Sequence, residues 1–264
     1  MGRYKGRRFT RERIIVAGDR MEVSVYPVFQ HPGQRRSRCR ESSEVQKRLN
    51  ERNSWNQLTR IAYANFSERD LVLHLTYEQE PESMEEGSRL LDNYLKKLRR
   101  RYQKAGIEMK YIKRTERGAK SGRVHHHLFL TGGIDRDEIE QLWSHGRCNS
   151  RRLQFGDDGI DGLSSYIAGA GKLRDTYRRW SCSRNCVRPV EEIRDGNMAM
   201  DEADDLGEAA SVGLAGDTLE MLYPGWECVK CEGIKNEMNQ GWYTYAILRR
   251  KRNGQTGKQR TGAA

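Results

Sequence analysis

The segment from Arg123 to Thr131 reads Arg-Val-His-His-His-Leu-Phe-Leu-Thr and has the composition of a buried strand. Side chains on a strand point alternately to its two faces, so His125 and His127 share one face. Two imidazoles on one face of a sheet are placed to bind a single divalent ion, whereas His126 points to the core side and packs there. The alternative is a polar strand end, because an isolated His-x-His pair often occurs by chance.

Patterns on either side of this strand predict an α+β fold. Strand patterns occupy residues 71–77, 107–116 and 124–131, and helix patterns occupy residues 84–104, 136–145 and the segment that starts near Gly162. The helix over 84–104 begins behind a possible capping box at Ser83. This order of elements predicts a central antiparallel sheet flanked by helices, with a poorly defined C-terminal extension.

The chain divides into four segments by composition. We expect an N-terminal hairpin and basic segment over 1–60 that pack on the core, the core itself over 61–190, an acidic linker or lid over 191–220, and a β segment with a basic tail over 221–264. The hairpin is predicted from the alternation of apolar and polar residues over 12–28.

The charge balance favours an anionic partner. Lys and Arg number 48 against 37 Asp and Glu, a net charge of +11, which is typical of proteins that bind nucleic acid. The sequence contains no apolar run long enough to span a membrane, and its N-terminus lacks an apolar signal core. We therefore expect a cytoplasmic protein with no membrane partner; the sequence does not indicate the oligomeric state.

Four cysteines form two closely spaced pairs. The spacings Cys182-x3-Cys186 and Cys228-x2-Cys231 are those of tetrahedral zinc sites, which usually combine two such pairs. In a reducing compartment these residues are not expected to form disulfides. The pairs predict a structural zinc site. The alternative is that Cys182 is a small buried residue and that Cys228 and Cys231 face opposite sides of one segment.

Glu116 and Tyr166 complete a candidate reaction centre. Glu116 ends the segment before the histidine strand, and a turn over 118–122 can bring its carboxylate to His125 and His127. A set of two imidazoles and a carboxylate suits Mg²⁺ or Mn²⁺ acting on phosphate, and imidazoles also bind zinc. Tyr166 is a candidate nucleophile because a tyrosine can attack a phosphodiester; the alternative is that it packs like its apolar neighbours.

Four motifs, in this order, resemble those of the HUH endonucleases. They are Leu-His-Leu-Thr-Tyr at 73–77, Glu116, Gly-Arg-Val-His-His-His-Leu at 122–128 and Gly-Leu-Ser-Ser-Tyr at 162–166. The chain is most similar to the single-tyrosine rolling-circle replication initiators, or Rep proteins, of plasmids and bacteriophages of Gram-positive type. In those proteins a segment like Trp180 to Asn185 follows the tyrosine, so the resemblance covers residues 12–190.

The resemblance implies an enzyme that nicks and joins single-stranded DNA at an origin. His125 and His127 would bind Mg²⁺ or Mn²⁺ with Glu116 as the third ligand, and Tyr166 would form a 5′-phosphotyrosine link that leaves a 3′-hydroxyl free. Basic side chains near the motifs are expected to contact the DNA: Arg114, Lys120, Arg123, Arg151 and Arg152. The sequence contains no Gly-x4-Gly-Lys-Ser/Thr loop, so we expect a host helicase and polymerase as further partners.

One position departs from the family pattern. The family places a lysine three residues after the tyrosine, where this chain has Gly169. The next lysine is Lys172, which a regular helix would turn away from the face of the tyrosine, and Arg174 is another nearby cation. Gly169 therefore keeps open the alternative of a catalytically inactive DNA-binding relative. A further alternative is a single-tyrosine transposase or relaxase with the same chemistry, which the C-terminal context argues against.

Overall fold

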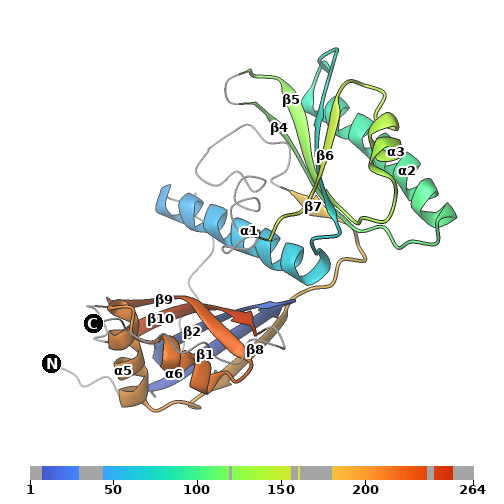
Figure 1. The fold of residues 1–264 in the computed structure, drawn as a ribbon. Coiled ribbons are helices and arrows are strands. Elements are labelled where there is room, and N and C mark those ends of the chain that lie inside the picture. The colour runs from blue at the N-terminus through green and yellow to red at the C-terminus, as the bar shows by residue number, and fades with distance from the viewer. Residues whose placement is uncertain are drawn as a thin grey trace, which may run out of the picture. The chain divides into compact units, whose positions relative to one another are not determined.

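The structure is a computed structural model of the 264-residue chain, and it describes residues 8–29, 44–118, 121–155, 160, 180–236 and 241–251. The chain folds into two compact units. The central unit comprises Arg40–Arg188, and the terminal unit combines Met1–Cys39 with Pro189–Ala264. Each unit contains one five-stranded antiparallel sheet and helices that pack on it (Figure 1). The predicted α+β class is therefore confirmed.

The histidine strand lies in the middle of the sheet of the central unit. This sheet has the order β6-β3-β5-β4-β7, and every neighbouring pair is antiparallel. Its strands are β3 (Leu71–Thr76), β4 (Tyr111–Arg117), β5 (Val124–Leu130), β6 (Cys148–Arg152) and β7 (Ser181–Cys182). Alternating residues of β3 and β5 therefore supply the two faces of the sheet.

Helices cover both faces of this sheet. The helices of the central unit are α1 (Glu44–Asn65), α2 (Met84–Lys104) and α3 (Arg136–Gln141). α2 and α3 pack on the face that carries Leu73 and Leu128, and α1 packs on the opposite face against Phe129 (Figure 1). Because residues two apart share a face, His125 and His127 lie on the same face as Phe129.

The helix predicted over 84–104 is confirmed as α2. It begins at Ser83, whose hydroxyl accepts a hydrogen bond from the backbone N–H of Glu86. Its apolar residues recur at helical spacing, so that Leu91, Leu95 and Leu98 are all buried against the sheet. The predicted helix near Gly162 lies outside the described residues.

The terminal unit is built from the two ends of the chain. Its sheet has the order β8-β1-β2-β10-β9. The elements are β1 (Arg8–Ala17), β2 (Arg20–Phe29), β8 (Val190–Asp195), α5 (Met200–Ser211), α6 (Gly216–Leu222), β9 (Trp226–Asn236) and β10 (Gly241–Arg250). The predicted hairpin is confirmed as β1 and β2, which turn at Gly18 with the left-handed φ of 58° that suits glycine.

Two expectations about the C-terminal part were wrong. The segment 191–220, predicted as an acidic linker or lid, forms most of β8 together with α5 and α6. Its acidic residues lie on the outer side of α5, whereas Ala203, Leu206 and Ala210 are buried at helical spacing. The region after 220 is not a poorly defined extension either, because β9 and β10 complete the sheet that the N-terminal hairpin begins.

None of the helices in the described part of the chain combines the length and the apolar character needed to cross a bilayer.

Candidate metal centre

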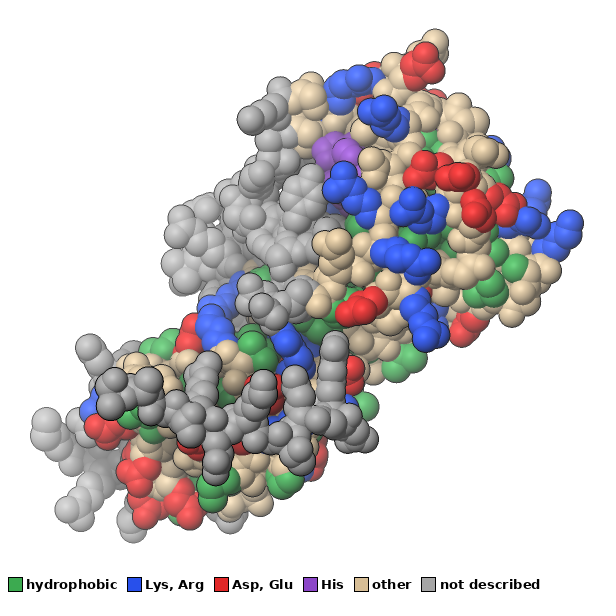
Figure 2. Space-filling view, in the orientation of Figure 1, with side chains coloured by type: hydrophobic (Ala, Val, Ile, Leu, Met, Phe, Trp, Pro, Cys, Tyr) green, Lys and Arg blue, Asp and Glu red, His purple; other side chains and the backbone are tan. Residues whose placement is uncertain are grey.

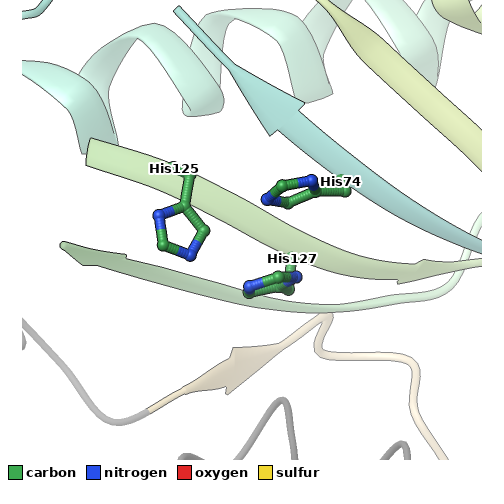
Figure 3. A group of neighbouring side chains, drawn as sticks. All are labelled: His74, His125 and His127. Atoms are coloured by element: carbon green, nitrogen blue, oxygen red, sulfur yellow. The ribbon is translucent and has the colours of Figure 1, made fainter. Parts of the chain in front are cut away.

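Three histidines converge on the face of the central sheet that β3 and β5 share. The register pairs His74 of β3 with His127 of β5, and His125 lies two residues before His127 on the same face. Their donor nitrogens all lie within 4.8 Å of one another, and Figure 3 shows the three rings directed toward a common point. His127 is buried, His125 is half-buried and His74 is exposed, so the group opens to solvent on one side.

The rings pack closely enough to suppress protonation. The ring of His74 stacks on that of His127, with 4.8 Å between centroids and 11° between planes. Partial desolvation of His74, together with the positive charge that His127 and His125 would carry, lowers the pKa of His74 to about 4. Burial likewise lowers the pKa of His127, although Glu116 opposes this shift. Near neutral pH these two imidazoles are therefore uncharged and have lone pairs for a metal ion.

Glu116 places a buried carboxylate beside two of these rings. Its Oε1 lies 3.2 Å from His125 Nε2 and 3.3 Å from His127 Nε2, and its Oε2 accepts from Arg114 Nη2 at 2.8 Å. Burial alone would raise the pKa of this carboxyl, but the hydrogen bonds with His125 and His127 and the charge of Arg114 hold the pKa well below its usual range. Glu116 is therefore an anion at the base of the histidine group.

The polarity of the contact between His125 and Glu116 fits a cation. His125 Nδ1 lies 3.2 Å from the carbonyl oxygen of Arg123, to which it donates when it carries the proton. In that tautomer Nε2 presents a lone pair to the ionised carboxylate 3.2 Å away, whereas in the other tautomer Nε2 donates the hydrogen bond that lowers the pKa of Glu116. A divalent ion held by both groups would take the place of that proton and satisfy both of them. The residues present therefore fit the divalent metal that the sequence implies.

His126 occupies the opposite face of β5, as predicted, and both of its ring nitrogens are hydrogen-bonded. Nε2 lies 2.6 Å from the hydroxyl of Tyr77, and Nδ1 lies 2.8 Å from the hydroxyl of Thr115. Burial lowers the pKa of His126 to about 3, so the ring is neutral. These bonds tie β5 to β4 and to the end of β3, which fixes the strands that carry the candidate ligands.

The residues predicted to contact DNA differ in their exposure and in their partners. Arg151 and Arg152 on β6 are exposed. Arg123 donates to the carboxylate of Glu80 and to the backbone carbonyl of Tyr77, whereas Arg114 is 3% exposed and paired with Glu116. The position of Arg114 supports a role inside the metal centre. Lys120, Tyr166, Gly169, Lys172 and Arg174 lie outside the described residues.

The four cysteines of the predicted zinc site are shared between the two units. Cys182 and Cys186 belong to the central unit, and Cys228 and Cys231 belong to β9 of the terminal unit. An irregularity in β9 pairs Cys228 with Leu248 and Cys231 with Ala246, so both cysteines pack toward the core of that unit and the alternative of opposite faces is wrong. Among the described residues, the metal-binding group contains histidines and no cysteine. The zinc site stays a prediction.

One family model matches the part of the chain that carries the histidines. Residues 70–169 match the model of the Replication-associated protein ORF2/G2P. This segment is therefore similar to the replication-associated proteins that the model describes. The match confirms the resemblance to Rep-type HUH endonucleases and covers β3 to β6 together with the motif that ends at Tyr166; the Gram-positive type stays a prediction. No curated protein and no solved structure shows a significant similarity to the chain.

His74 is the member of the site that the sequence reasoning did not assign. It stands in the Leu-His-Leu-Thr-Tyr motif between two leucines that are fully buried. On a strand, that position faces away from the leucines and therefore toward the face of His125 and His127 once β3 pairs with β5. A histidine at the outward position of the strand was the available signal, but the pairing of the two strands was needed to use it.

Proposed function

We propose that this chain is a metal-dependent nicking and joining enzyme for single-stranded DNA that initiates rolling-circle replication. The observation that carries the proposal is the convergence of three imidazoles and an ionised carboxylate on one sheet face, inside the Rep-type segment. Neutral imidazoles and a carboxylate are ligands for a divalent ion, and the basic character of the chain suits a DNA substrate.

In this proposal His74, His125 and His127 hold the ion, together with Glu116. A bound divalent cation would polarise the scissile phosphate and neutralise the charge that develops on it. Glu116 also orients His125 and His127, and Arg114 keeps the carboxylate ionised. Of the two ions expected from the sequence, three imidazoles favour Mn²⁺ over Mg²⁺, because Mg²⁺ prefers oxygen ligands.

Tyr166 is the proposed nucleophile. Its phenolic oxygen attacks the phosphorus and its proton passes to solvent; the bond from phosphorus to the 3′ oxygen breaks, and that oxygen leaves as a hydroxyl after it takes a proton. The product is a 5′-phosphotyrosine ester, and attack by a 3′-hydroxyl reverses the step and joins the strand. This role rests on the Gly-Leu-Ser-Ser-Tyr motif at 162–166 within the matched segment.

Lys172 is the proposed substitute for the lysine that the family places after the tyrosine. A host helicase and a host polymerase would complete replication.

A covalent-adduct assay tests this function. The full chain is incubated with end-labelled single-stranded origin DNA and Mn²⁺, and the adduct that survives denaturation is measured. We expect an adduct in the wild type and none in Tyr166→Phe, in His127→Ala or in the presence of a chelator. Tyr177→Phe is the matched control, because it removes the hydroxyl of another tyrosine on the same stretch of chain and should leave the adduct.

Gly169 favours a second candidate, a DNA-binding relative without cleavage activity. A relative of this kind would bind the same single-stranded DNA but would form no covalent adduct with Mg²⁺ or with Mn²⁺. An adduct that persists in Tyr166→Phe would instead keep the enzyme and reject Tyr166 as its nucleophile. A transposase or relaxase would share the adduct and differ in its substrate, so origin DNA and transposon-end or transfer-origin DNA are compared in the same assay.

A further inference from the structure

A polar groove with a volume of about 430 Å³ lies between α2 and the β4–β7 edge of the central sheet. This volume is within the range of about 300–1,000 Å³ that is usual for small-molecule sites. On one side the groove is lined by Arg89 and Lys96 of α2, and on the other by Lys113 and Arg114 of β4. Trp180, next to the start of β7, contributes an aromatic ring.

The charge of this groove suits a phosphate group. Arg89, Lys96 and Lys113 stand in this lining against the carboxylates of Glu85 and Asp92, whereas the guanidinium of Arg114 is buried against Glu116. Lys113 is paired with Asp92 and Arg89 with Glu86, whereas Lys96 is exposed and contacts the side-chain oxygen of Asn93 at 3.5 Å. Within the described part of the chain Lys96 has no carboxylate partner, so it is the cation best placed to meet an anionic ligand.

The aromatic side of the groove is held in a fixed orientation. The indole Nε1 of Trp180 lies 3.0 Å from the hydroxyl oxygen and 3.2 Å from the carbonyl oxygen of Ser54, and donates to them. The ring also packs against the apolar cluster beneath α1 and remains half-buried. A ring that is already oriented loses little conformational entropy when a base stacks on it.

Arg114 lies at the β4 edge of the groove, but its side chain is buried and points to the opposite face of the sheet, where it pairs with Glu116. The charge that the groove offers a ligand therefore comes from the cations of α2 and from Lys113. Figure 2 shows Lys and Arg side chains gathered beside the exposed histidine surface of the central unit, so the charge of this surface also suits a polyanion.

We propose that this groove is a nucleotide subsite, which holds an unpaired nucleotide of the DNA strand. Lys96 binds its phosphate, and the base stacks on Trp180. The assignment of the DNA as a substrate rests on the proposed function, but binding in the groove needs neither the metal nor Tyr166. The subsite therefore contributes to affinity when cleavage is blocked.

Binding measurements with two neighbouring lysines test the phosphate contact. Fluorescein-labelled oligodeoxythymidylate is titrated with the full chain in a chelator, and anisotropy is recorded at several salt concentrations. Lys97 follows Lys96 on α2, is also exposed and does not line the groove, so Lys97→Ala is the matched control. We expect Lys96→Ala to weaken binding about fivefold at 0.1 M salt and to reduce the salt-dependence slope by about 0.7, as the loss of one contact to a single strand does.

Photo-crosslinking tests the stacking contact. An oligonucleotide that carries 5-iododeoxyuridine at one position is irradiated with the full chain, and the crosslinked peptide is identified by mass spectrometry. We expect a crosslink at Trp180 for one or two positions of the strand, and its loss in Trp180→Leu. Trp180→Phe, which keeps a ring, should retain binding within about threefold, because stacking depends on the aromatic face.

The outcomes separate this inference from the proposed function. Equal affinities and equal salt slopes for Lys96→Ala and Lys97→Ala, with no crosslink at Trp180, would overturn the subsite, and an adduct in the same preparations would leave the nicking function intact. A specific effect of Lys96→Ala with a crosslink at Trp180 would support the subsite, even if no preparation forms an adduct and the nicking function fails.

Discussion

The two units of this chain share an architecture, but each surrounds a buried carboxylate with different partners. In the terminal unit Glu12 is 3% exposed, and it accepts hydrogen bonds from the hydroxyl of Tyr223 and, at 3.1 Å, from Asn197 Nδ2. In the central unit Glu116 is 4% exposed and faces imidazole nitrogens at 3.2 and 3.3 Å. Donors from the protein satisfy Glu12, whereas Glu116 accepts from Arg114 and also faces two imidazoles that are candidate metal ligands.

This difference shows that the sheet alone does not define the site. Both sheets have five antiparallel strands, and both bury apolar side chains under helices. Only the central sheet, among the described residues, carries a group of side chains that could bind a metal ion. The functional distinction comes from which residues stand at the outward positions of two neighbouring strands.

The largest expected effect comes from neutralising the two carboxylates in turn. Glu116→Gln removes the anion from the metal centre, so we expect the rate of adduct formation with Mn²⁺ to fall at least a hundredfold. Glu12→Gln removes a structural hydrogen-bond acceptor in the other unit and should lower stability by about 1–3 kcal/mol without changing that rate. Single-turnover kinetics and thermal unfolding measure the two effects. Equal losses of rate in both variants would contradict the comparison.

The second prediction concerns stabilisation by the metal. A ligand that binds the folded state at 100 times its dissociation constant stabilises it by about 2.7 kcal/mol. We expect Mn²⁺ to slow amide hydrogen exchange in β3, β4 and β5 by a corresponding factor, and to leave exchange in β1, β2 and β10 nearly unchanged. Slower exchange across both sheets would show that the ion does not act through the central site.

The third prediction uses the buried imidazole of His126. Its pKa is about 3 in the folded chain against about 6.5 in an unfolded one, so below pH 6.5 only the unfolded chain takes up this proton. Stability therefore falls as the pH is lowered, by about 2 kcal/mol at pH 5 from this residue alone. We expect faster hydrogen exchange in the central unit at pH 5 than at pH 7, after correction for intrinsic rates and in a chelator.

The terminal unit is the internal control for that measurement. The acidic groups Glu192 and Asp195 have a pKa below the usual range because Arg194 and Arg11 hydrogen-bond to them. Any stability that these exposed pairs contribute is lost only as the pH falls through those low values, below the range tested. An equal loss of protection in both units between pH 7 and 5 would refute the assignment to the buried imidazole.

The smallest expected effect is that of His74→Ala. Removing one of several ligands, and the most exposed one, should weaken Mn²⁺ binding about tenfold in calorimetry. His145→Ala is the matched control, since His145 belongs to the same unit and its ring contacts Tyr77 and Trp143 rather than the histidine group. If His74→Ala binds Mn²⁺ with unchanged affinity, the ligands of the ion are only His125, His127 and Glu116, as the sequence predicted.

Local patterns in the sequence predict the elements of the central unit well. The period of two in 71–77 corresponds to β3, the apolar run of 124–131 corresponds to β5, and the helical spacing of Leu91, Leu95 and Leu98 corresponds to α2. In β3 and α2 one face is more buried than the other, which makes the pattern strong, whereas β5 is buried on both faces. The convergence of Glu116 with His125 follows from a short hairpin, which sequence reasoning can also anticipate.

The features that were missed depend on contacts between distant parts of the chain. The pairing of β2 with β10 joins the N-terminal hairpin to the C-terminal strands, and no local pattern specifies such a partner. The helix α5 escaped prediction because Ala203 and Ala210 give a weak apolar stripe among many acidic residues. His74 was missed for the first reason, since its role depends on β3 lying beside β5.

The most direct test of the metal centre is an anomalous diffraction map of the full chain crystallised with Mn²⁺. We predict one strong peak within about 2.4 Å of the ring nitrogens of His74, His125 and His127 and of a carboxylate oxygen of Glu116. A map with the ion elsewhere, or with no peak at saturating Mn²⁺, would contradict the account.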